Sequence, residues 1–129
     1  MYRVLVVEDD PILRRLLSTT LAPEGYEVIQ AFNASLGLEA CRKEKPDIVV
    51  LDVNLPDGDG IDVCRAIKDD PSIRHIPILI ITGEAVQVEK RMEGLEAGAD
   101  DYILKPFNAR ELVSRLKNIL KAAAKPTQS

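Results

Sequence analysis

Short aliphatic runs recur along the chain and alternate with longer segments in which apolar residues have helical spacing. Five segments have strand length, of which the second is weaker and alternating: 4–7, 26–29, 48–51, 77–81 and 102–104. Continuous apolar runs of this length predict strands that are buried on both faces of a sheet. The pattern therefore predicts five strands, each followed by a helical segment.

The helical segments are clearest at the two ends of the chain. Apolar residues recur at helical spacing in the first and last of these segments, at Leu13, Leu16, Leu17, Leu21, Leu112, Leu116, Ile119 and Leu120. The three segments between them, at about 35–44, 61–68 and 87–97, are shorter and less regular. We expect all five to be helices that pack an apolar face against the sheet.

Residues that favour caps and turns mark the boundaries of these segments. They are Asp10 and Pro11 before the first helix, Lys45-Pro46-Asp47 and Gly98 after the second and fourth, and Asn108 before the fifth. We expect Asp10 to act as a helix cap rather than as a ligand. Residues 57–60 predict a turn and a cap that lead into the third helix.

Strands that alternate with helices through short links require parallel pairing with right-handed crossovers. The helices then cover both faces of the sheet, so the expected fold is an open, doubly wound α/β domain. A length of 129 residues without an internal repeat indicates one domain. Because the apolar stripe is lost after residue 122, we expect residues 1–122 to form this domain and residues 123–129 to be a C-terminal tail or the start of a linker.

Charge and cysteine content exclude several classes of function. A formal net charge of −4 argues against a basic surface that neutralises nucleic-acid phosphates. Only Cys41, Cys64 and His75 could bind zinc through sulfur or imidazole, so we expect no zinc site and two reduced thiols in the core. The first apolar run ends at Glu8, far short of a signal segment or a membrane span. We therefore expect a cytoplasmic domain without membrane contact or direct nucleic-acid contact.

Polar side chains stand where the predicted strands end. Glu8 and Asp9 follow the first strand, Asp52 the third, Thr82 the fourth and Lys105 the fifth. The carboxyl ends of parallel strands meet at one edge of the sheet, where such folds bind ligands. Carboxylates gathered there repel one another, and a bound Mg²⁺ or Mn²⁺ would relieve that repulsion and bridge to a phosphoryl oxygen. With Lys105 and main-chain N–H groups to balance the charge, the pattern predicts a metal-plus-phosphoryl site.

Four stretches of the sequence, in order and each at a strand end, resemble response regulator receiver domains. They are Val6-Val7-Glu8-Asp9-Asp10, Asp52-Val53-Asn54-Leu55-Pro56-Asp57-Gly58-Asp59-Gly60, Ile81-Thr82-Gly83 and Gly98-Ala99-Asp100-Asp101-Tyr102-Ile103-Leu104-Lys105-Pro106-Phe107. The resemblance covers nearly the whole chain. It implies a flavodoxin-like fold with strand order 2-1-3-4-5 and a cis Lys105–Pro106 bond. It also implies a two-component signalling domain, not an enzyme, with only slow self-catalysed phosphorylation and dephosphorylation.

The resemblance implies that Asp52 is the phosphoacceptor, a carboxylate nucleophile for a phosphoryl group. Asp9 and Asp52 would bind Mg²⁺ directly, with the main-chain carbonyl of Asn54 as a third protein ligand. Glu8 would act mostly through water. The family often has Asp at this last position, so its contact can differ here.

Lys105 would hold the phosphoryl group, and Thr82 would donate its hydroxyl to a phosphoryl oxygen. Tyr102 would change rotamer as Thr82 moves, although an ordinary core aromatic is the alternative interpretation of this residue. The main-chain N–H groups of Val53 and Gly83 would also bind phosphoryl oxygens.

Two further positions would modulate the chemistry. Gly83 stands where the family most often has Ala, and the smaller residue should widen access to the phosphate. Asn54 and Glu84 flank the path of an attacking water and would tune how fast the phosphoryl group is lost.

The implied phosphoryl donor is a histidine kinase or a histidine-containing phosphotransfer protein. The surface formed by the fourth helix, fifth strand and fifth helix would switch, and a homodimer could form through it. A Mg²⁺-dependent phosphatase would need an acid where Asn54 stands, and a flavodoxin-like nucleotide-binding protein would need a Gly-rich loop in place of Glu8-Asp9-Asp10-Pro11. A docking module that works without phosphorylation stays open.

Overall fold

A single five-stranded parallel sheet organises the computed structural model, which describes residues 1–83 and 88–124. Its strands are β1 (Arg3–Val7), β2 (Glu27–Ala31), β3 (Ile48–Asp52), β6 (Ile78–Gly83) and β7 (Asp101–Lys105). They lie side by side in the order β2-β1-β3-β6-β7, with every pair parallel. Because β6 and β7 are the fourth and fifth strands of this sheet along the chain, the expected order 2-1-3-4-5 is confirmed.

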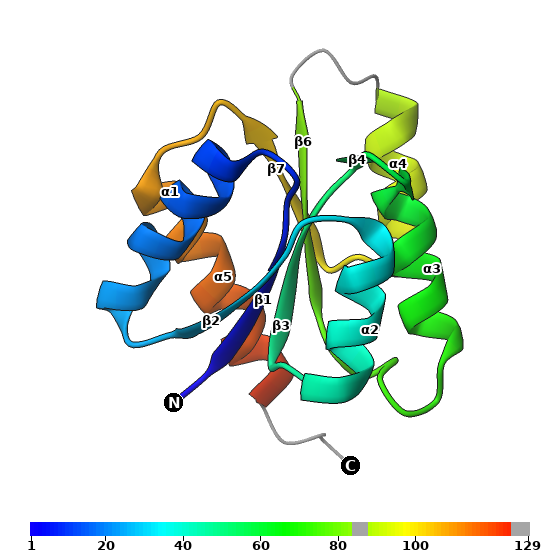
Figure 1. Ribbon diagram of the computed structural model, residues 1–129, viewed down its shortest axis with the longest axis horizontal. Helices are drawn as coiled ribbons and strands as arrows, with labels where there is room; N and C mark the ends of the chain where they lie inside the picture. Colours follow the sequence, from blue (N-terminus) through cyan, green and yellow to red (C-terminus); the bar gives the residue numbers. More distant parts are fainter. Residues whose placement is uncertain (84–87, 125–129) are drawn as a thin grey trace.

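Helices cover both faces of the sheet (Figure 1). They are α1 (Pro11–Leu21), α2 (Ala34–Glu44), α3 (Gly60–Asp69), α4 (Val88–Glu96) and α5 (Ala109–Ala124), and a short 3₁₀ turn, Ala22–Glu24, follows α1. Helices α1 and α5 lie on one face, whereas α2, α3 and α4 lie on the other. The doubly wound α/β fold is therefore confirmed, and α5 continues two residues beyond the expected end of the domain.

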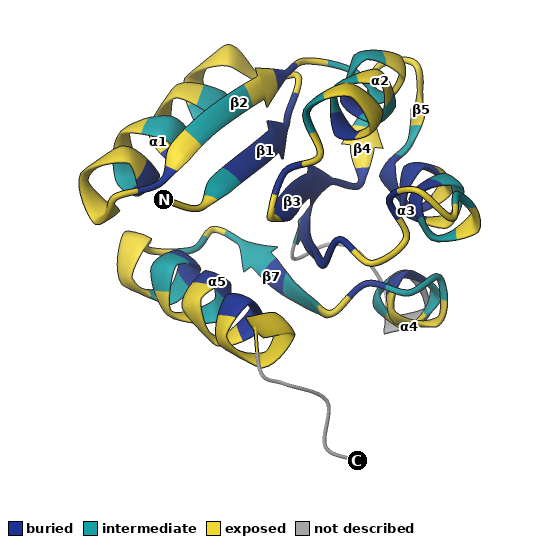
Figure 2. Cartoon of the chain, turned by 90° about the horizontal axis from the view of Figure 1, so that it is seen from below, coloured by how far each residue is buried: buried dark blue, intermediate teal, exposed yellow. Residues whose placement is uncertain are grey.

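The sheet divides the core into two layers because successive side chains of a strand point to opposite faces. In β1, Leu5 and Val7 pack with α2 and α3, whereas Val4 and Val6 pack with α1 and α5. Burial is almost complete in β1, β3 and β6, and Figure 2 shows β1 and β3 as mostly buried. This explains why these strands read as unbroken apolar runs.

Both cysteines are free and buried, as expected. Burial raises the pKa of each thiol, Cys41 and Cys64, to about 11. These thiols therefore stay protonated and behave as small core side chains.

The predicted helix caps are confirmed. Asp10 accepts a hydrogen bond from the N–H of Ile12, and Pro11 occupies the first helical position of α1. Asn108 accepts from the N–H of Glu111 at the start of α5. The Lys105–Pro106 peptide bond is cis, as the resemblance implies.

Two local features differ from the sequence prediction. Leu16, expected on the buried stripe of α1, is 52% exposed, because Leu17 and Leu21 set the face that packs on the sheet. In addition, the turn before α3 belongs to a small antiparallel hairpin of β4 (Asn54–Leu55) and β5 (Gly58–Asp59). Within the described part of the chain, no helix is long and apolar enough to cross a membrane.

Candidate functional site

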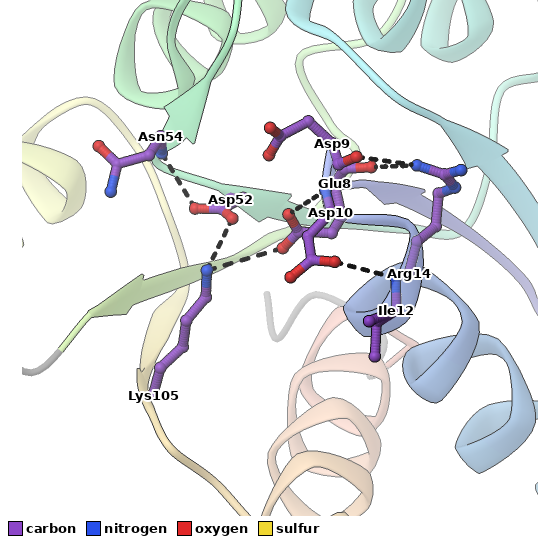
Figure 3. A network of polar contacts seen from close by, with 8 residues as sticks. All are labelled: Glu8, Asp9, Asp10, Ile12, Arg14, Asp52, Asn54 and Lys105. Atoms are coloured by element: carbon purple, nitrogen blue, oxygen red, sulfur yellow. Dashed lines mark hydrogen bonds and ion pairs between the residues drawn. The ribbon is translucent and has the colours of Figure 1, made fainter.

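The polar residues at the strand ends converge at the carboxyl edge of the sheet, as predicted (Figure 3). Strand pairing produces this arrangement, since Asp52 is level with Ile81 in β6 and Gly83 is level with Lys105 in β7. Glu8 continues from β1, and its N–H donates to the carbonyl of Ala31 at 3.0 Å. Four chain segments that are distant in sequence therefore meet in one site.

Asp52 is the central group of this site and is only 2% exposed. Its Oδ1 atom accepts a hydrogen bond from the N–H of Asn54 at 2.9 Å. Its Oδ2 atom accepts one from Nζ of Lys105 at 2.8 Å. Each carboxylate oxygen thus has a donor, and the pair of donors fixes the plane of the carboxylate.

Lys105 is the cation that balances the buried acids. Its Nζ atom lies 2.8 Å from Oδ2 of Asp52 and 3.7 Å from Oε1 of Glu8. Burial alone would lower the pKa of Lys105, but the hydrogen bond and the charge of Asp52 outweigh it and raise the pKa. Lys105 is therefore charged at neutral pH.

Glu8 is the acid of the site whose ionised form is least stabilised by its surroundings. It is 1% exposed, and its Oε2 atom accepts from the N–H of Asp10 at 3.0 Å. Its Oε1 atom has no hydrogen-bond partner among the described residues. Burial, followed by the neighbouring Asp52, raises the pKa of Glu8 to about 8.

One carboxylate oxygen each from Glu8, Asp9 and Asp52 lies within 4.8 Å of the others, which makes this cluster a candidate cation site. Asp9 is exposed, so the cluster has one open side. The residues present fit a hard divalent cation, because all three ligands are oxygens and Glu8, a member of the cluster, has a buried Oε1 atom with no hydrogen-bond partner among the described residues.

Arg14 of α1 holds the main chain of Glu8 and Asp9, a role that the sequence analysis did not predict. Its Nη1 atom donates to the main-chain carbonyls of Glu8 and Asp9 at 2.9 and 3.4 Å. Its Nε atom donates to Gln30 at 3.2 Å. An arginine on the first turns of a helix carries no sequence signal for such a contact, because its partners are main-chain atoms.

Thr82 and Tyr102, the expected switch pair, lie on neighbouring strands. Thr82 is 1% exposed, and its hydroxyl has no hydrogen-bond partner within the described residues. The ring of Tyr102 is half-buried against the core, and the guanidinium of Arg91 in α4 lies 5.6 Å from its centroid. The contact of Tyr102 with the core fits both interpretations of this residue, a switch residue and an ordinary core aromatic.

The other predicted site residues directly follow Asp52 or stand at the end of β6 and just after it. The N–H of Val53 donates to the carbonyl of Ile81 at 3.1 Å, so this amide is already engaged in the sheet. A Cβ added at Gly83 would meet nothing within 4 Å, which agrees with an open position. Asn54 is exposed, and its side chain points away from Asp52 (Figure 3). Glu84 lies outside the described residues.

Among known protein families, the response regulator receiver domain matches residues 4–117 of this chain. Among curated proteins, a "probable transcriptional regulator ycf27" of Pyropia yezoensis is 43% identical over 98% of this chain and 51% of its own length. The "DNA-binding response regulator MtrA" of Mycolicibacterium smegmatis is 43% identical over 89% of this chain and 49% of its own length. The chain thus spans about half the length of the curated relatives it matches.

Solved structures give the same result. The chemotaxis protein CheY4 of Vibrio cholerae superimposes with a TM-score of 0.86 at 32% identity, covering 92% of this chain and 98% of that one. A CheY-like response regulator receiver domain protein of Methanospirillum hungatei has a TM-score of 0.89 at 31% identity, with 95% and 96% covered.

Proposed function

The chain belongs to the response regulator receiver domain family, and we propose that it receives a phosphoryl group on Asp52 in a Mg²⁺-dependent reaction. The donor is a histidine kinase or a histidine-containing phosphotransfer protein. The observation that carries the proposal is the Asp52 carboxylate, which is fixed by Asn54 and Lys105 beside the acids Glu8 and Asp9. Domains of this family are signalling domains, and only slow self-catalysed transfer is expected.

Asp9 and Asp52 would hold the Mg²⁺, together with the main-chain carbonyl of Asn54, while Glu8 would act through water. When bound, the ion neutralises phosphoryl charge and orients the donor. The raised pKa of Glu8 and its unsatisfied Oε1 support this assignment, because a nearby cation would stabilise the ionised form.

In the transfer itself, one oxygen of Asp52 attacks the phosphorus atom in line with the leaving group. The new O–P bond forms as the P–N bond of the phosphohistidine breaks, and the bonding pair returns to the imidazole nitrogen. Lys105 stabilises the charge on the phosphoryl oxygens. Thr82 donates its hydroxyl to one of them, which would give this buried group a partner. The main-chain N–H groups of Val53 and Gly83 also donate to phosphoryl oxygens. The N–H of Val53 would then share its hydrogen bond between the carbonyl of Ile81 and the phosphoryl group.

Phosphorylation would then bias the surface formed by α4, β7 and α5. Movement of Thr82 toward the phosphoryl group would free space for the Tyr102 ring, whose contact with Arg91 joins β7 to α4. Met92 and Leu95 of α4 are 54% and 43% exposed, so this surface offers apolar groups to a partner or to a second copy. The positions of Asn54 and Glu84 would tune how long the modification lasts.

Residues 1–122 would act as the receiver, and residues 123–129 as a tail or as the start of a linker. Several curated relatives are named transcriptional or DNA-binding regulators. The net charge of −4 makes direct nucleic-acid contact by residues 1–122 unfavourable. Any such contact would therefore belong to a different part of a longer protein.

The test is the intact mass of the protein after incubation with acetyl phosphate and Mg²⁺, compared with an Asp52→Asn variant and with an EDTA control. We expect one added phosphoryl group in the wild type with metal and none in either control. A beryllofluoride complex would be sought if the adduct is too short-lived to detect. Failure of both would favour a docking module that works without phosphorylation.

A further inference from the structure

We propose that Asp57 is a positioning residue for the metal site, because it ties the β4–β5 hairpin that carries the Asn54 carbonyl to the start of α2. The inference rests on the proposed function and extends it to a residue whose side chain takes no part in the Asp52 cluster. Its consequence is that Asp57 sets the affinity for Mg²⁺ without touching the ion or the phosphoryl group.

The contact at α2 is complete and specific. Oδ1 of Asp57 accepts from the N–H of Ala34 at 2.7 Å, and Oδ2 accepts from the N–H of Ser35 at 3.0 Å. The next two amides, those of Leu36 and Gly37, donate to the side chain and the carbonyl of Asn33. The first three N–H groups of α2 are thus satisfied by side chains, two of them by a carboxylate that lies 22 and 23 residues further along the chain, while the Gly37 N–H makes the first ordinary helical bond.

The hydrogen bonds from the N–H groups of Ala34 and Ser35 to the Asp57 carboxylate are of a strong kind. Hydrogen bonds to an ionised carboxylate are shorter and stronger than those between neutral groups, and the helix dipole favours an anion at this end of α2. The two backbone hydrogen bonds lower the pKa of Asp57, so the carboxylate stays ionised at neutral pH. One side chain therefore clamps the hairpin to α2. The strands β4 and β5 lie on the same side of the sheet as α2 and α3 (Figure 2).

The base of the hairpin is fixed separately. The N–H of Asn54 donates to Oδ1 of Asp52, and the N–H of Gly60 donates to the carbonyl of Val53 at 2.7 Å. Between base and tip, Asn54 pairs with Asp59, and Leu55 pairs with Gly58. The Asn54 carbonyl thus lies in a two-residue ladder whose base is anchored at the acceptor.

A two-stranded ladder this short has little stability of its own. Because Asp57 lies at its turn, the contact with α2 holds the far end in place together with the packing of Leu55 against the core. Without the Asp57 contact, the peptide group that follows Asn54 would sample a wider range of orientations, and the Asn54 carbonyl would be aligned with the ion for less of the time, whereas the Asn54 N–H belongs to the preceding peptide group, which Asp52 holds. The hydrogen bonds between Asp52 and its own donors would remain.

The experiment measures Mg²⁺ affinity by titration calorimetry in the wild type, Asp57→Ala, Asp57→Asn and Asp62→Asn. Asp62 is the matched control, because it is exposed, pairs with Arg65 three residues away in α3 and lines the same hollow between α2 and α3 as Asp57. Loss of a residue that orients a metal ligand costs 10–100-fold in affinity, and a weakly held ion that keeps several waters should lie at the low end, about tenfold. Folding of each variant is checked by circular dichroism.

We expect Asp57→Ala to raise the Mg²⁺ dissociation constant about tenfold, Asp57→Asn to raise it less because one amide acceptor remains, and Asp62→Asn to leave it nearly unchanged. The rate of Asp52 phosphorylation at saturating Mg²⁺ should stay within about twofold of the wild type, because the acceptor itself is not disturbed.

Two outcomes would overturn the inference. One is an unchanged dissociation constant in folded Asp57→Ala. The other is an equal loss in Asp57→Ala, Asp57→Asn and Asp62→Asn, which would mean that only the long-range charge of these carboxylates matters. If the wild type itself neither binds Mg²⁺ nor forms the adduct, the proposed function fails rather than the role of Asp57.

Discussion

Nζ of Lys105 donates a hydrogen bond to Oδ2 of Asp52 at 2.8 Å and also lies 3.7 Å from Oε1 of Glu8. One ammonium group therefore faces two carboxylates that are almost fully buried. Burial raises the pKa of Glu8 to about 8, so ionising both acids beside one ammonium leaves an excess of negative charge that a divalent cation can compensate. It also places a positive charge where a phosphoryl group bound to Asp52 would develop its own negative charge.

Replacing Lys105 with Gln should slow phosphorylation of Asp52 by acetyl phosphate by at least about tenfold, since removal of one such stabilising donor typically costs 10²–10³-fold in rate. The Mg²⁺-induced rise in melting temperature should persist, because Lys105 repels the ion rather than binding it. Lys43→Gln, at an exposed position of α2, is the control. An unchanged rate in Lys105→Gln would contradict the assigned role.

Gly60 and Gly58 form a matched pair for testing how tightly the acceptor loop is packed. A Cβ at Gly60 would overlap the carbonyl oxygen of Asp52 and lie 2.9 Å from Cα of Val53, whereas a Cβ at Gly58 would meet nothing within 4 Å. Gly60→Ala should therefore destabilise the protein by about 3 kcal/mol, the upper end of the usual cost of overpacking. Gly58→Ala should change the free energy of unfolding by less than about 1 kcal/mol. Urea denaturation measures both, and equal effects would refute the packing argument.

Much of the fold could be predicted because its signals are local. The apolar runs identified the strands, and Asp10 followed by Pro11 marked the start of α1 through contacts within a few residues. The direction in which a helix faces is not local. Leu16 has the right spacing for the apolar stripe of α1, yet the packing of Leu17 and Leu21 on the sheet turns it toward solvent.

The same distinction applies to the site. Asp52 and Lys105 could be located because each ends a predicted strand. Asp57, in contrast, has the sequence of an ordinary turn residue, and its partners in α2 lie more than 20 residues earlier. No periodicity or motif in one sequence connects two such positions, so this contact became visible only when the elements were placed in space.

Asp70 should give the protein a dependence of stability on acid pH. Its carboxylate accepts from the hydroxyl and N–H of Ser72 and from Nε of Arg42, and these contacts lower its pKa from 3.8 to about 2. A lowered folded-state pKa means that the stabilisation is present above pH 4 and is lost as pH falls toward 2. The urea midpoints of the wild type and Asp70→Asn should therefore differ most at pH 6, begin to converge below pH 4 and approach each other as pH falls toward 2.

The control for this pH series is Asp69→Asn, which removes the same charge from an exposed neighbouring position at the end of α3. Its midpoint should stay parallel to that of the wild type across the series. A constant gap between the wild type and Asp70→Asn would show that the contacts of Asp70 do not depend on its ionisation.

Mg²⁺ should raise the melting temperature relative to EDTA, because an ion that binds only the folded protein stabilises it by mass action. At ten times its dissociation constant the gain is about 1.4 kcal/mol, which for a chain of this size corresponds to a shift of about 3–6 °C. Asp9→Asn removes the exposed carboxylate of the cluster formed by Glu8, Asp9 and Asp52, and should abolish the shift.

Asp9 and Asp69 are acids of equal charge, and they differ in whether they belong to the cluster of Glu8, Asp9 and Asp52. Asp69→Asn also lowers the net negative charge by one, but Asp69 lies at the end of α3 and outside the cluster. It should therefore keep the full Mg²⁺ shift, measured at constant ionic strength so that general screening is the same in every sample. Equal loss of the shift in both variants would indicate diffuse attraction of cations to an acidic protein. A shift that survives Asp9→Asn would remove this residue from the metal site.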